Sequence, residues 1–325
     1  MSGTPETAEL VRAGGDHVPG LLTQVEDLLA AIAGGHGDVL ARHAGETISA
    51  GGKRLRPLLV VLAAGAPRDA ATARAIVSAG AAVELVHSAT LVHDDVLDAA
   101  GLRRGRPTVV AAGGRQMATA TGDLLFSRAF AVLARDDDAA AIRALSAACS
   151  ALARGELLQR ADAWDGATTV DRYLLRCELK TASLFAAACE LGLLAGRRAP
   201  ELGDFGRRIG LAFQLLDDVL DVSGPAERTG KHRGTDLLDG TVTLPFILAR
   251  ERDPELARLD PRSVTRPEQA EQICERIVAS GALEAVRAIA LEHVAAAKAG
   301  LQPSVEPERR EALELVADGV VARYS

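Results

Sequence analysis

The chain has 325 residues, and its 44 acidic and 37 basic side chains give it a formal net charge of −7. This acidic balance argues against nucleic acid as a partner, because a phosphate backbone is bound by a basic surface. Apolar residues make up 48% of the chain but aromatic residues only 3%. The apolar residues are largely Ala, Leu and Val, which suit closely packed helices, and no period-2 strand pattern is present. We therefore predict an all-α protein.

We divide the chain into a polar N-terminal lead, residues 1–18, and a single all-α domain, residues 19–325. Glycine pairs, prolines and polar stretches separate the predicted helices. The predicted helices span about residues 21–33, 38–50, 57–65, 69–98, 118–134, 139–161, 170–194, 201–221 and 241–250, and three shorter helices follow. A glycine-rich loop at 99–116 and a polar loop at 223–240 are also predicted.

The N-terminus lacks the basic segment and apolar segment of a secretion signal, and no run of about 18 uncharged apolar residues is present. The cysteines have no CxxC spacing and fall in apolar helical stretches, so we predict that they are reduced core residues. They are Cys149, Cys177, Cys189 and Cys274. We expect a cytoplasmic protein without stable membrane insertion.

The most informative feature is a pentapeptide, DDVLD, that occurs at residues 94–98 and again at 217–221, each time inside an apolar run. Three carboxylates on a mostly buried helix repel one another and are costly to desolvate unless a cation neutralises them. The first and last aspartates of each copy share a helix face. Two such clusters would suit Mg²⁺ ions that also bind substrate phosphates, so we expect an organic diphosphate as substrate. The candidates are Asp94, Asp95, Asp98, Asp217, Asp218 and Asp221.

The alternative interpretation of a single DDVLD copy is a solvated helix face, because aspartates are common at protein surfaces. The neighbouring residues argue against this alternative. Leu85, Val86 and Val92 surround the first copy, and Leu211 and Leu215 precede the second. A helix that is apolar on nearly every side is a core helix.

Basic residues lie near each acidic copy in the sequence. The segment GGKRLRP, residues 51–57, places three cations after two glycines, and these cations would suit a diphosphate. Its alternative is an ordinary basic loop. Two further basic sets, one after each acidic copy, weaken that alternative. The basic candidates are Lys53, Arg54, Arg56, Arg103, Arg104 and Lys231.

Four polar residues within apolar helices are further candidates. His87 lies two turns before the first acidic copy and shares its face, although a lone helical histidine is more often a packed or surface residue. Gln214 points with the second copy. Lys180, followed by Thr181, lies among Leu and Ala, where a lysine either extends outward or neutralises a buried anion.

Six motifs in this order and spacing resemble those of the trans-isoprenyl diphosphate synthases, also called the polyprenyl synthetase family. They are GGKRLRP, ELVHSATLVHDDVLD, RRGRPT, ELKTASLF, GLAFQLLDDVLD and GKHRGTDLLDGTVTLP. The resemblance covers about residues 20–300. It implies the isoprenoid synthase fold, with helices around a central catalytic cavity and the acidic copies on opposite walls, usually in a homodimer.

The resemblance also implies residue roles in a head-to-tail condensation of an allylic prenyl diphosphate with isopentenyl diphosphate. Three Mg²⁺ ions would be held by Asp94, Asp98 and Asp217. The family positions that contact the allylic diphosphate are matched by Arg103, Lys180, Thr181, Gln214 and Lys231. The positions of the isopentenyl diphosphate pocket are matched by Lys53, Arg56, His87 and Arg104. We assign a catalytic role to the six aspartates, Lys180 and Lys231.

The implied mechanism is ionisation of the allylic diphosphate, attack by the isopentenyl double bond on the resulting carbocation, and loss of a proton to the released diphosphate. No side-chain nucleophile is required. Dry apolar walls would protect the cation from water.

The residues one turn before the first acidic copy, Ala89 and Thr90, are small. The resemblance places the floor of the prenyl cavity here, and short-chain farnesyl synthases commonly have aromatic residues at these positions. We therefore expect a product longer than farnesyl, of the medium- or long-chain quinone side-chain type, with geranylgeranyl diphosphate as the alternative. Phe126 is the nearest aromatic residue that would close the tunnel, unless it is core packing.

Two rival functions share the fold. Terpene cyclases typically have a different second metal motif and lack the GGKRLRP type of segment, because they bind no second diphosphate. Regulatory subunits of synthases characteristically lose aspartates from the motifs, and this chain keeps all six. We therefore favour an active synthase.

Overall fold

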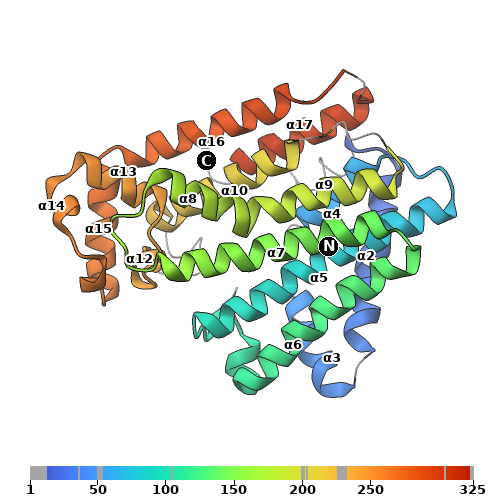
Figure 1. The fold of residues 1–325 in the computed structure, drawn as a ribbon, viewed down its shortest axis with the longest axis horizontal. Coiled ribbons are helices and arrows are strands. Elements are labelled where there is room, and N and C mark those ends of the chain that lie inside the picture. Colours follow the sequence, from blue (N-terminus) through green and yellow to red (C-terminus); the bar gives the residue numbers. More distant parts are fainter. Residues whose placement is uncertain are drawn as a thin grey trace. The chain divides into compact units, whose positions relative to one another are not determined.

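The computed structural model describes residues 13–35, 37–49, 54–103, 105–198, 202, 204–224, 233–303 and 305–322. Most of these residues are helical (Figure 1), so the predicted all-α class is confirmed. The chain forms two compact units, which are described separately. Unit 1 comprises Met1–Cys149, Leu184–Gly206 and Gly300–Val316, and unit 2 comprises Ser150–Ser183, Arg207–Ala299 and Ala317–Ser325. The single domain of residues 19–325 stays a prediction.

Unit 1 is built mainly on five helices and one short hairpin. These elements are α2 (His17–Gly34), α3 (Asp38–Ser49), α4 (Leu55–Ala64), α5 (Ala70–Leu97), β1 (Leu102–Arg103), β2 (Arg106–Pro107) and α6 (Val109–Leu133), followed by the 3₁₀ turn η1 (Ala134–Asp136). Four helices contribute residues to both units: α7 (Ala139–Ala161), α9 (Ser183–Ala195), α10 (Phe205–Ser223) and α17 (Pro307–Ala322).

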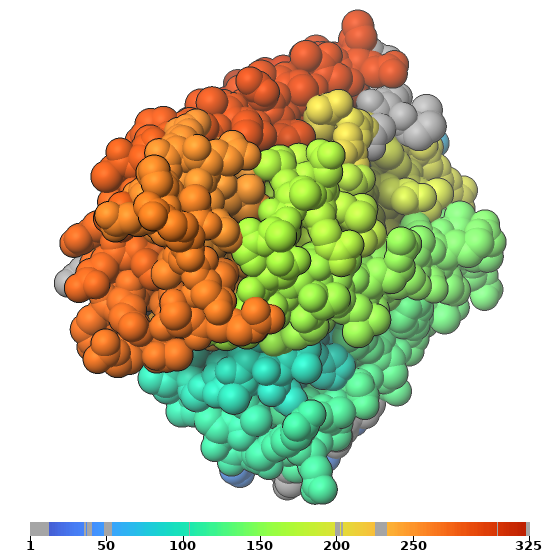
Figure 2. All heavy atoms as spheres, turned by 60° about the vertical axis from the view of Figure 1, so that its left-hand side comes forward, coloured from blue at the N-terminus to red at the C-terminus, as the bar shows by residue number. Residues whose placement is uncertain are grey.

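Unit 2 contains the other elements that the structure describes. They are α8 (Val170–Cys177), η2 (Glu178–Ala182), α12 (Thr235–Leu238), α13 (Leu244–Arg252), α14 (Pro254–Arg258), η3 (Pro261–Ser263), α15 (Pro267–Ala279) and α16 (Ala282–Ala299). Arg276 of α15 bonds both carboxylate oxygens of Asp253, the N-cap of α14, at 3.0 and 2.8 Å. Figure 2 shows the atoms of this C-terminal part of unit 2 in orange. The predicted C-terminal helices are α15, α16 and α17, although α16, with 18 residues, is not short.

The central helix of unit 1 is α5, which agrees with the predicted helix at 69–98. Asp69 caps it by accepting a hydrogen bond from the Thr72 N–H at 2.7 Å. Among the described residues α5 is the one helix long and apolar enough to cross a membrane, but 78% of that apolar stretch is buried inside the protein. Helix α6 lies beside it (Figure 1). The apolar character of α5 is therefore that of a core helix.

The glycine-rich loop predicted at residues 99–116 is partly wrong, because α6 already begins at Val109. Thr108 starts this helix by accepting a hydrogen bond from the Ala111 N–H at 3.2 Å. Gly114 has φ 78° and ψ 171°, so the glycines mark a break within α6. The loop also contains a short hairpin, in which β1 and β2 pair antiparallel around a turn at Gly105, whose φ is 74°.

The helix predicted at residues 170–194 is interrupted by a π-helical segment, η2, which contains Lys180 and Thr181. π-helical turns are rare and often occur at functional sites. Helix α7 approaches η2 closely at Gly155, where a Cβ atom would lie only 2.6 Å from the backbone nitrogen of Lys180. Glycine at this position therefore allows the two backbones to meet.

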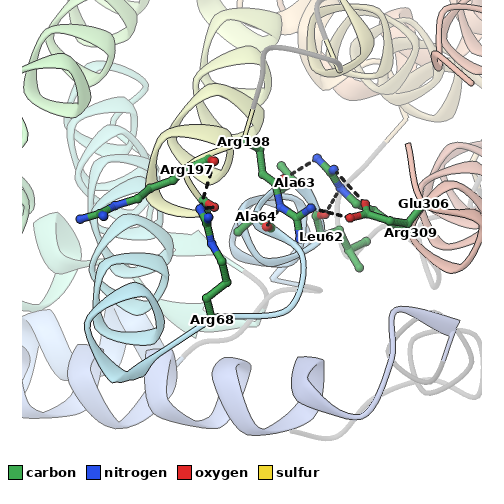
Figure 3. A network of polar contacts seen from close by, with 9 residues as sticks. Leu62, Ala63, Ala64, Arg68, Arg197, Arg198, Glu306 and Arg309 are labelled. Atoms are coloured by element: carbon green, nitrogen blue, oxygen red, sulfur yellow. Dashed lines mark hydrogen bonds and ion pairs between the residues drawn. The ribbon is translucent and has the colours of Figure 1, made fainter. Parts of the chain in front are cut away.

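Arginine side chains cover the C-terminal end of α4 within unit 1 (Figure 3). The guanidinium of Arg309, which is 5% exposed, donates to the carbonyl oxygens of Leu62 at 2.9 Å and Ala63 at 2.5 Å. Arg198 donates to the Ala64 carbonyl at 3.2 Å and also pairs with Glu306. The last carbonyls of a helix have no intrahelical partner and carry partial negative charge, so cationic donors are well placed there.

We predict that Arg309→Met lowers the free energy of unfolding by about 2–4 kcal/mol, because it leaves two buried carbonyls without donors. Urea denaturation followed by circular dichroism measures this loss. Arg287→Met is the control, since Arg287 makes an exposed ion pair with Glu284 and its removal should cost less than about 0.5 kcal/mol. Equal losses of stability in the two variants would contradict the stabilising role of Arg309 at the C-terminal end of α4.

Candidate functional site

The first acidic copy lies in unit 1 and the second in unit 2. In both copies the middle aspartate differs from the two outer ones in burial. The middle aspartate is buried in each copy: Asp95 is 4% exposed and Asp218 is 3% exposed. The outer aspartates are more accessible, and they are Asp94, Asp98, Asp217 and Asp221. Within each helix the outer pair therefore faces away from the core while the middle carboxylate faces into it.

In the first copy the middle aspartate is neutralised by an arginine of the hairpin. Arg103 reaches Oδ1 of Asp95 with its Nε and with one terminal nitrogen, each at 2.8 Å. Asp98 is the C-cap of α5, and its N–H donates to the Asp94 carbonyl. The C-terminal end of a helix already carries partial negative charge, so these carboxylates favour a bound cation. The contact of Arg103 with an allylic diphosphate stays a prediction.

In the second copy the middle aspartate accepts hydrogen bonds from two neutral donors. The Tyr173 hydroxyl donates to Oδ2 of Asp218 at 2.6 Å, and the Gln214 amide donates to Oδ1 at 2.7 Å. The Thr181 hydroxyl in turn donates to the Gln214 carbonyl oxygen at 2.6 Å. Three predicted site residues, Thr181, Gln214 and Asp218, are thus joined in one chain of hydrogen bonds.

Burial raises the pKa of Asp218 to about 8, and the negative charges of Asp236 and Asp217 act in the same direction. The hydrogen bonds from Tyr173 and Gln214 oppose this shift. Burial, together with the charge of Asp218, also raises the pKa of Tyr173 well above its usual value. Tyr173 is therefore a neutral donor throughout the physiological pH range.

Lys180 binds a carboxylate that the sequence analysis missed. Its ammonium lies 2.5 Å from Oε2 of Glu156, and Nε of Arg160 lies 2.7 Å from Oε1 of the same carboxylate. Burial works to raise the pKa of Glu156, but Lys180 and Arg160 together hold it below its usual value. Glu156 is therefore ionised at neutral pH. No periodicity in the sequence relates it to Lys180, because the two residues lie 24 positions apart on separate elements.

Asp236 is a second missed residue, and here a sequence signal existed, since it lies within the motif GKHRGTDLLDGTVTLP. Its backbone N–H lies 3.3 Å from Oδ2 of Asp221. Its charge also contributes to the raised pKa of Asp218. Helix α12 therefore adds a carboxylate to the surroundings of the second acidic copy.

Two arginines of the basic segment at the start of α4, Arg54 and Arg56, make different contacts. Arg54, with a left-handed φ of 48°, bonds Glu26 at 2.6 and 3.0 Å, Glu84 at 2.6 Å and the Ile48 carbonyl at 2.8 Å. Its hydrogen-bonding groups are thus directed to the protein itself. Burial lowers the pKa of Arg56 to about 10 against the charge of Glu84. The Arg56 guanidinium lies 4.5 Å from the ring centre of Phe185.

The predicted chain-length residues lie on α5 and α6 of unit 1. Ala89 is fully buried, and the Thr90 hydroxyl donates to the carbonyl of His87 at 2.7 Å. The Phe126 ring stacks on His93 of α5 with a centroid distance of 5.7 Å. Phe126 therefore takes part in the packing of α6 against α5, which was the alternative interpretation of this residue.

Three predicted site residues, Lys53, Arg104 and Lys231, lie outside the described residues. Within the described part of the chain, no group of three or more His, Cys, Asp or Glu side chains is close enough to hold a metal ion. A cavity of about 300 Å³ lies between α2 and α3, and among its lining residues only Arg54 is one of the basic candidates. All four cysteines are free; Cys177, Cys189 and Cys274 are buried core residues as predicted, whereas Cys149 is only half-buried.

Comparisons with known proteins agree with the resemblance. The family model described as polyprenyl synthetase matches residues 38–280. The chain is 36% identical over 301 residues to the short chain isoprenyl diphosphate synthase of Methanothermobacter thermautotrophicus, covering 88% of this chain and 91% of that protein. It is 38% identical over 274 residues to the octaprenyl diphosphate synthase of Escherichia coli, covering 82% and 84% of the two chains.

A solved structure is similar over the whole length of the chain. It is the polyprenyl synthase from Caulobacter crescentus complexed with calcium and isoprenyl diphosphate. The TM-score is 0.87 at 36% sequence identity, and the match covers 100% of this chain and 99% of the other. This likeness confirms the predicted isoprenoid synthase fold.

We predict that Arg54→Met lowers the free energy of unfolding by about 3–5 kcal/mol at neutral pH, because it leaves the buried Glu84 carboxylate without its hydrogen-bonding cation. Burial already raises the pKa of Glu84, so stability contributed by its protonated form is present at low pH and lost as the pH rises. The penalty should therefore be smaller at pH 5 than at pH 8 in urea denaturation.

The double variant Arg54→Met with Glu84→Gln is the matched control. A neutral amide in place of the carboxylate should recover part of the lost stability and remove most of the pH dependence. If the double variant were as unstable as the single one at both pH values, the buried carboxylate would not be the cause.

Proposed function

The chain belongs to the polyprenyl synthetase family and is a prenyltransferase, and on this premise we propose that it makes an all-trans polyprenyl diphosphate longer than farnesyl. The substrates are isopentenyl diphosphate, which is added head-to-tail, and an allylic prenyl diphosphate. The single observation that carries the proposal is the pair of acidic copies, in which the outer carboxylates are accessible and the middle ones are held by the protein.

The acidic copies suit hard divalent cations, because every donor in them is a carboxylate oxygen. Asp95 and Asp218 are buried and bonded to Arg103 and Tyr173, so they are poor ligands. We propose Asp94, Asp98 and Asp217 as ligands of three Mg²⁺ ions. The calcium in the Caulobacter crescentus relative supports a requirement for divalent metal. When bound, the ions neutralise the diphosphate as it leaves the allylic carbon.

The protein's own residues bind the two diphosphates and keep the reacting carbons dry. Lys180, whose ammonium is positioned by Glu156, and Thr181 bind the allylic diphosphate together with Arg103, Gln214 and Lys231. Lys53, Arg56, His87 and Arg104 bind isopentenyl diphosphate. Buried apolar side chains such as Ala89 exclude water from the carbocation. The released diphosphate accepts the proton that is lost after condensation.

A medium- or long-chain product of the quinone side-chain type is our proposal for chain length. Its support is the small, fully buried Ala89 one turn before the first acidic copy and the similarity to an octaprenyl diphosphate synthase. Geranylgeranyl diphosphate is the alternative, and the similarity to a short-chain synthase keeps it in consideration. We further propose that the chain acts as a homodimer in the cytoplasm.

Incubation of the purified protein with isopentenyl diphosphate and Mg²⁺ tests the function directly. Dimethylallyl, geranyl, farnesyl and geranylgeranyl diphosphates serve in turn as primers, and mass spectrometry sizes the products. We expect all-trans products that end at one defined length beyond farnesyl, and no turnover with EDTA. Cyclised hydrocarbons would indicate a cyclase, and no turnover with any primer would indicate a regulatory subunit.

We predict that Ala89→Phe shortens the main product by at least one isoprene unit, because the larger side chain would block the proposed prenyl cavity one turn before Asp94. The same mass-spectrometric assay gives the distribution of lengths, which is independent of how much enzyme folds. Val278→Phe is the control, since Val278 is exposed on α15 and an aromatic ring there should leave the distribution unchanged. An unchanged distribution of product lengths in Ala89→Phe would contradict the proposal that residue 89 lies at the floor of the prenyl cavity.

A further inference from the structure

Tyr173 of α8 has no role in the proposed reaction. Its side chain is nevertheless completely buried, and its hydroxyl donates a hydrogen bond to the second acidic copy. Among the described residues it is one of the largest fully buried side chains. A buried hydroxyl is costly to desolvate and is normally placed where it has a partner. Here the partner is the middle aspartate, Asp218.

The Tyr173 ring is also held by a contact with Arg176. The Arg176 guanidinium lies 5.2 Å from the ring centre and donates to the Val242 carbonyl at 2.5 Å. Arg176 is itself 3% exposed. Because a cation over an aromatic face attracts the ring, Tyr173 is held in place by a group that is anchored to the backbone.

Asp218 transmits this constraint in two directions. It belongs to α10, the helix that carries Asp217 and Asp221, so fixing the Asp218 carboxylate limits rotation of that part of the helix about its axis. Its second oxygen accepts from Gln214, whose carbonyl oxygen accepts from Thr181 on the π-helical segment η2. One chain of hydrogen bonds therefore connects α8, α10 and η2 within unit 2.

We propose that Tyr173 is a positioning residue that orients the outer aspartates of α10 for metal. This inference rests on the proposed function. It requires no contact between Tyr173 and the substrate. It predicts that loss of one hydroxyl weakens metal binding more than it weakens the fold.

The test is Tyr173→Phe, which removes the hydroxyl and keeps the ring that Arg176 covers. Calorimetric titration with Mn²⁺ in the presence of inorganic pyrophosphate measures the metal affinity. We expect this affinity to fall about tenfold, the size expected for a lost hydrogen bond to a buried carboxylate. In the prenyl transfer assay the Mg²⁺ concentration at half-maximal rate should rise similarly, while kcat at saturating Mg²⁺ stays within about threefold of the wild-type value.

Thr168→Val is the matched control. Thr168 is 5% exposed, lies just before α8 in the same unit, and its hydroxyl donates to the Asp165 carbonyl at 2.8 Å. We expect the control to lose stability and to bind Mn²⁺ like the wild type. If Tyr173→Phe folds and binds Mn²⁺ within twofold of the wild type, or if the control loses as much affinity, the inference is overturned.

A measurement on the unsubstituted chain covers the case in which Tyr173→Phe does not fold. The chain has only two tyrosines, so ¹³C labelling of the tyrosine ring gives two NMR signals, and Tyr324→Phe assigns them. The Tyr173 signal should shift when Mg²⁺ and pyrophosphate are added, because the Asp218 hydrogen bond is coupled to the metal ligands. A constant signal, with binding confirmed by calorimetry, would refute the coupling.

The two proposals fail differently. An active wild-type enzyme with a Tyr173→Phe variant that is unchanged in metal affinity overturns only the role of Tyr173. A wild-type protein that binds no Mn²⁺ with pyrophosphate and transfers no prenyl group overturns the proposed function, and the positioning role with it.

Discussion

The cost of placing carboxylates on core helices is the constraint on which the rest of this protein depends. Each DDVLD copy puts three acids near the negative end of a helix, where an uncompensated charge is destabilising. The middle carboxylate of each copy is hydrogen-bonded within the protein. Asp95 is bonded to the cation Arg103, and Asp218 accepts from two neutral donors, Tyr173 and Gln214. The outer acids remain accessible and favour an external cation. A divalent metal bound to a diphosphate is a cation of this kind.

Several of the basic candidates also form ion pairs within the protein. Arg54 joins Glu26 and Glu84, and Lys180 rests on Glu156. In the proposed reaction, a lysine held by a carboxylate is positioned before the substrate arrives, which lowers the entropy lost on binding. Arg309 supports the opposite end of α4 through two backbone carbonyls. The helix that begins with the basic segment is thereby fixed at both ends.

Helix class and the long core helix α5 could be predicted because they depend on local patterns. Apolar residues on nearly every side of α5 and its capping Asp69 are visible in the sequence. The shared face of the outer aspartates was predicted from helix geometry, but the contacts of the middle aspartates with Arg103 and Tyr173 were not, since only the folded chain brings these residues together. Glu156 was missed for the same reason. Gly114 misled the prediction, because a glycine in a helix and a glycine in a loop look alike in sequence.

Anomalous diffraction from crystals soaked with Mn²⁺ and inorganic pyrophosphate tests most directly the claim that the outer aspartates bind metal while the middle ones hold the site in place. The account predicts anomalous peaks within coordination distance of Asp94, Asp98 and Asp217, with Asp95 still bonded to Arg103 and Asp218 to Tyr173. Peaks coordinated by Asp95 or Asp218, or the absence of any peak at the two acidic copies, would contradict it.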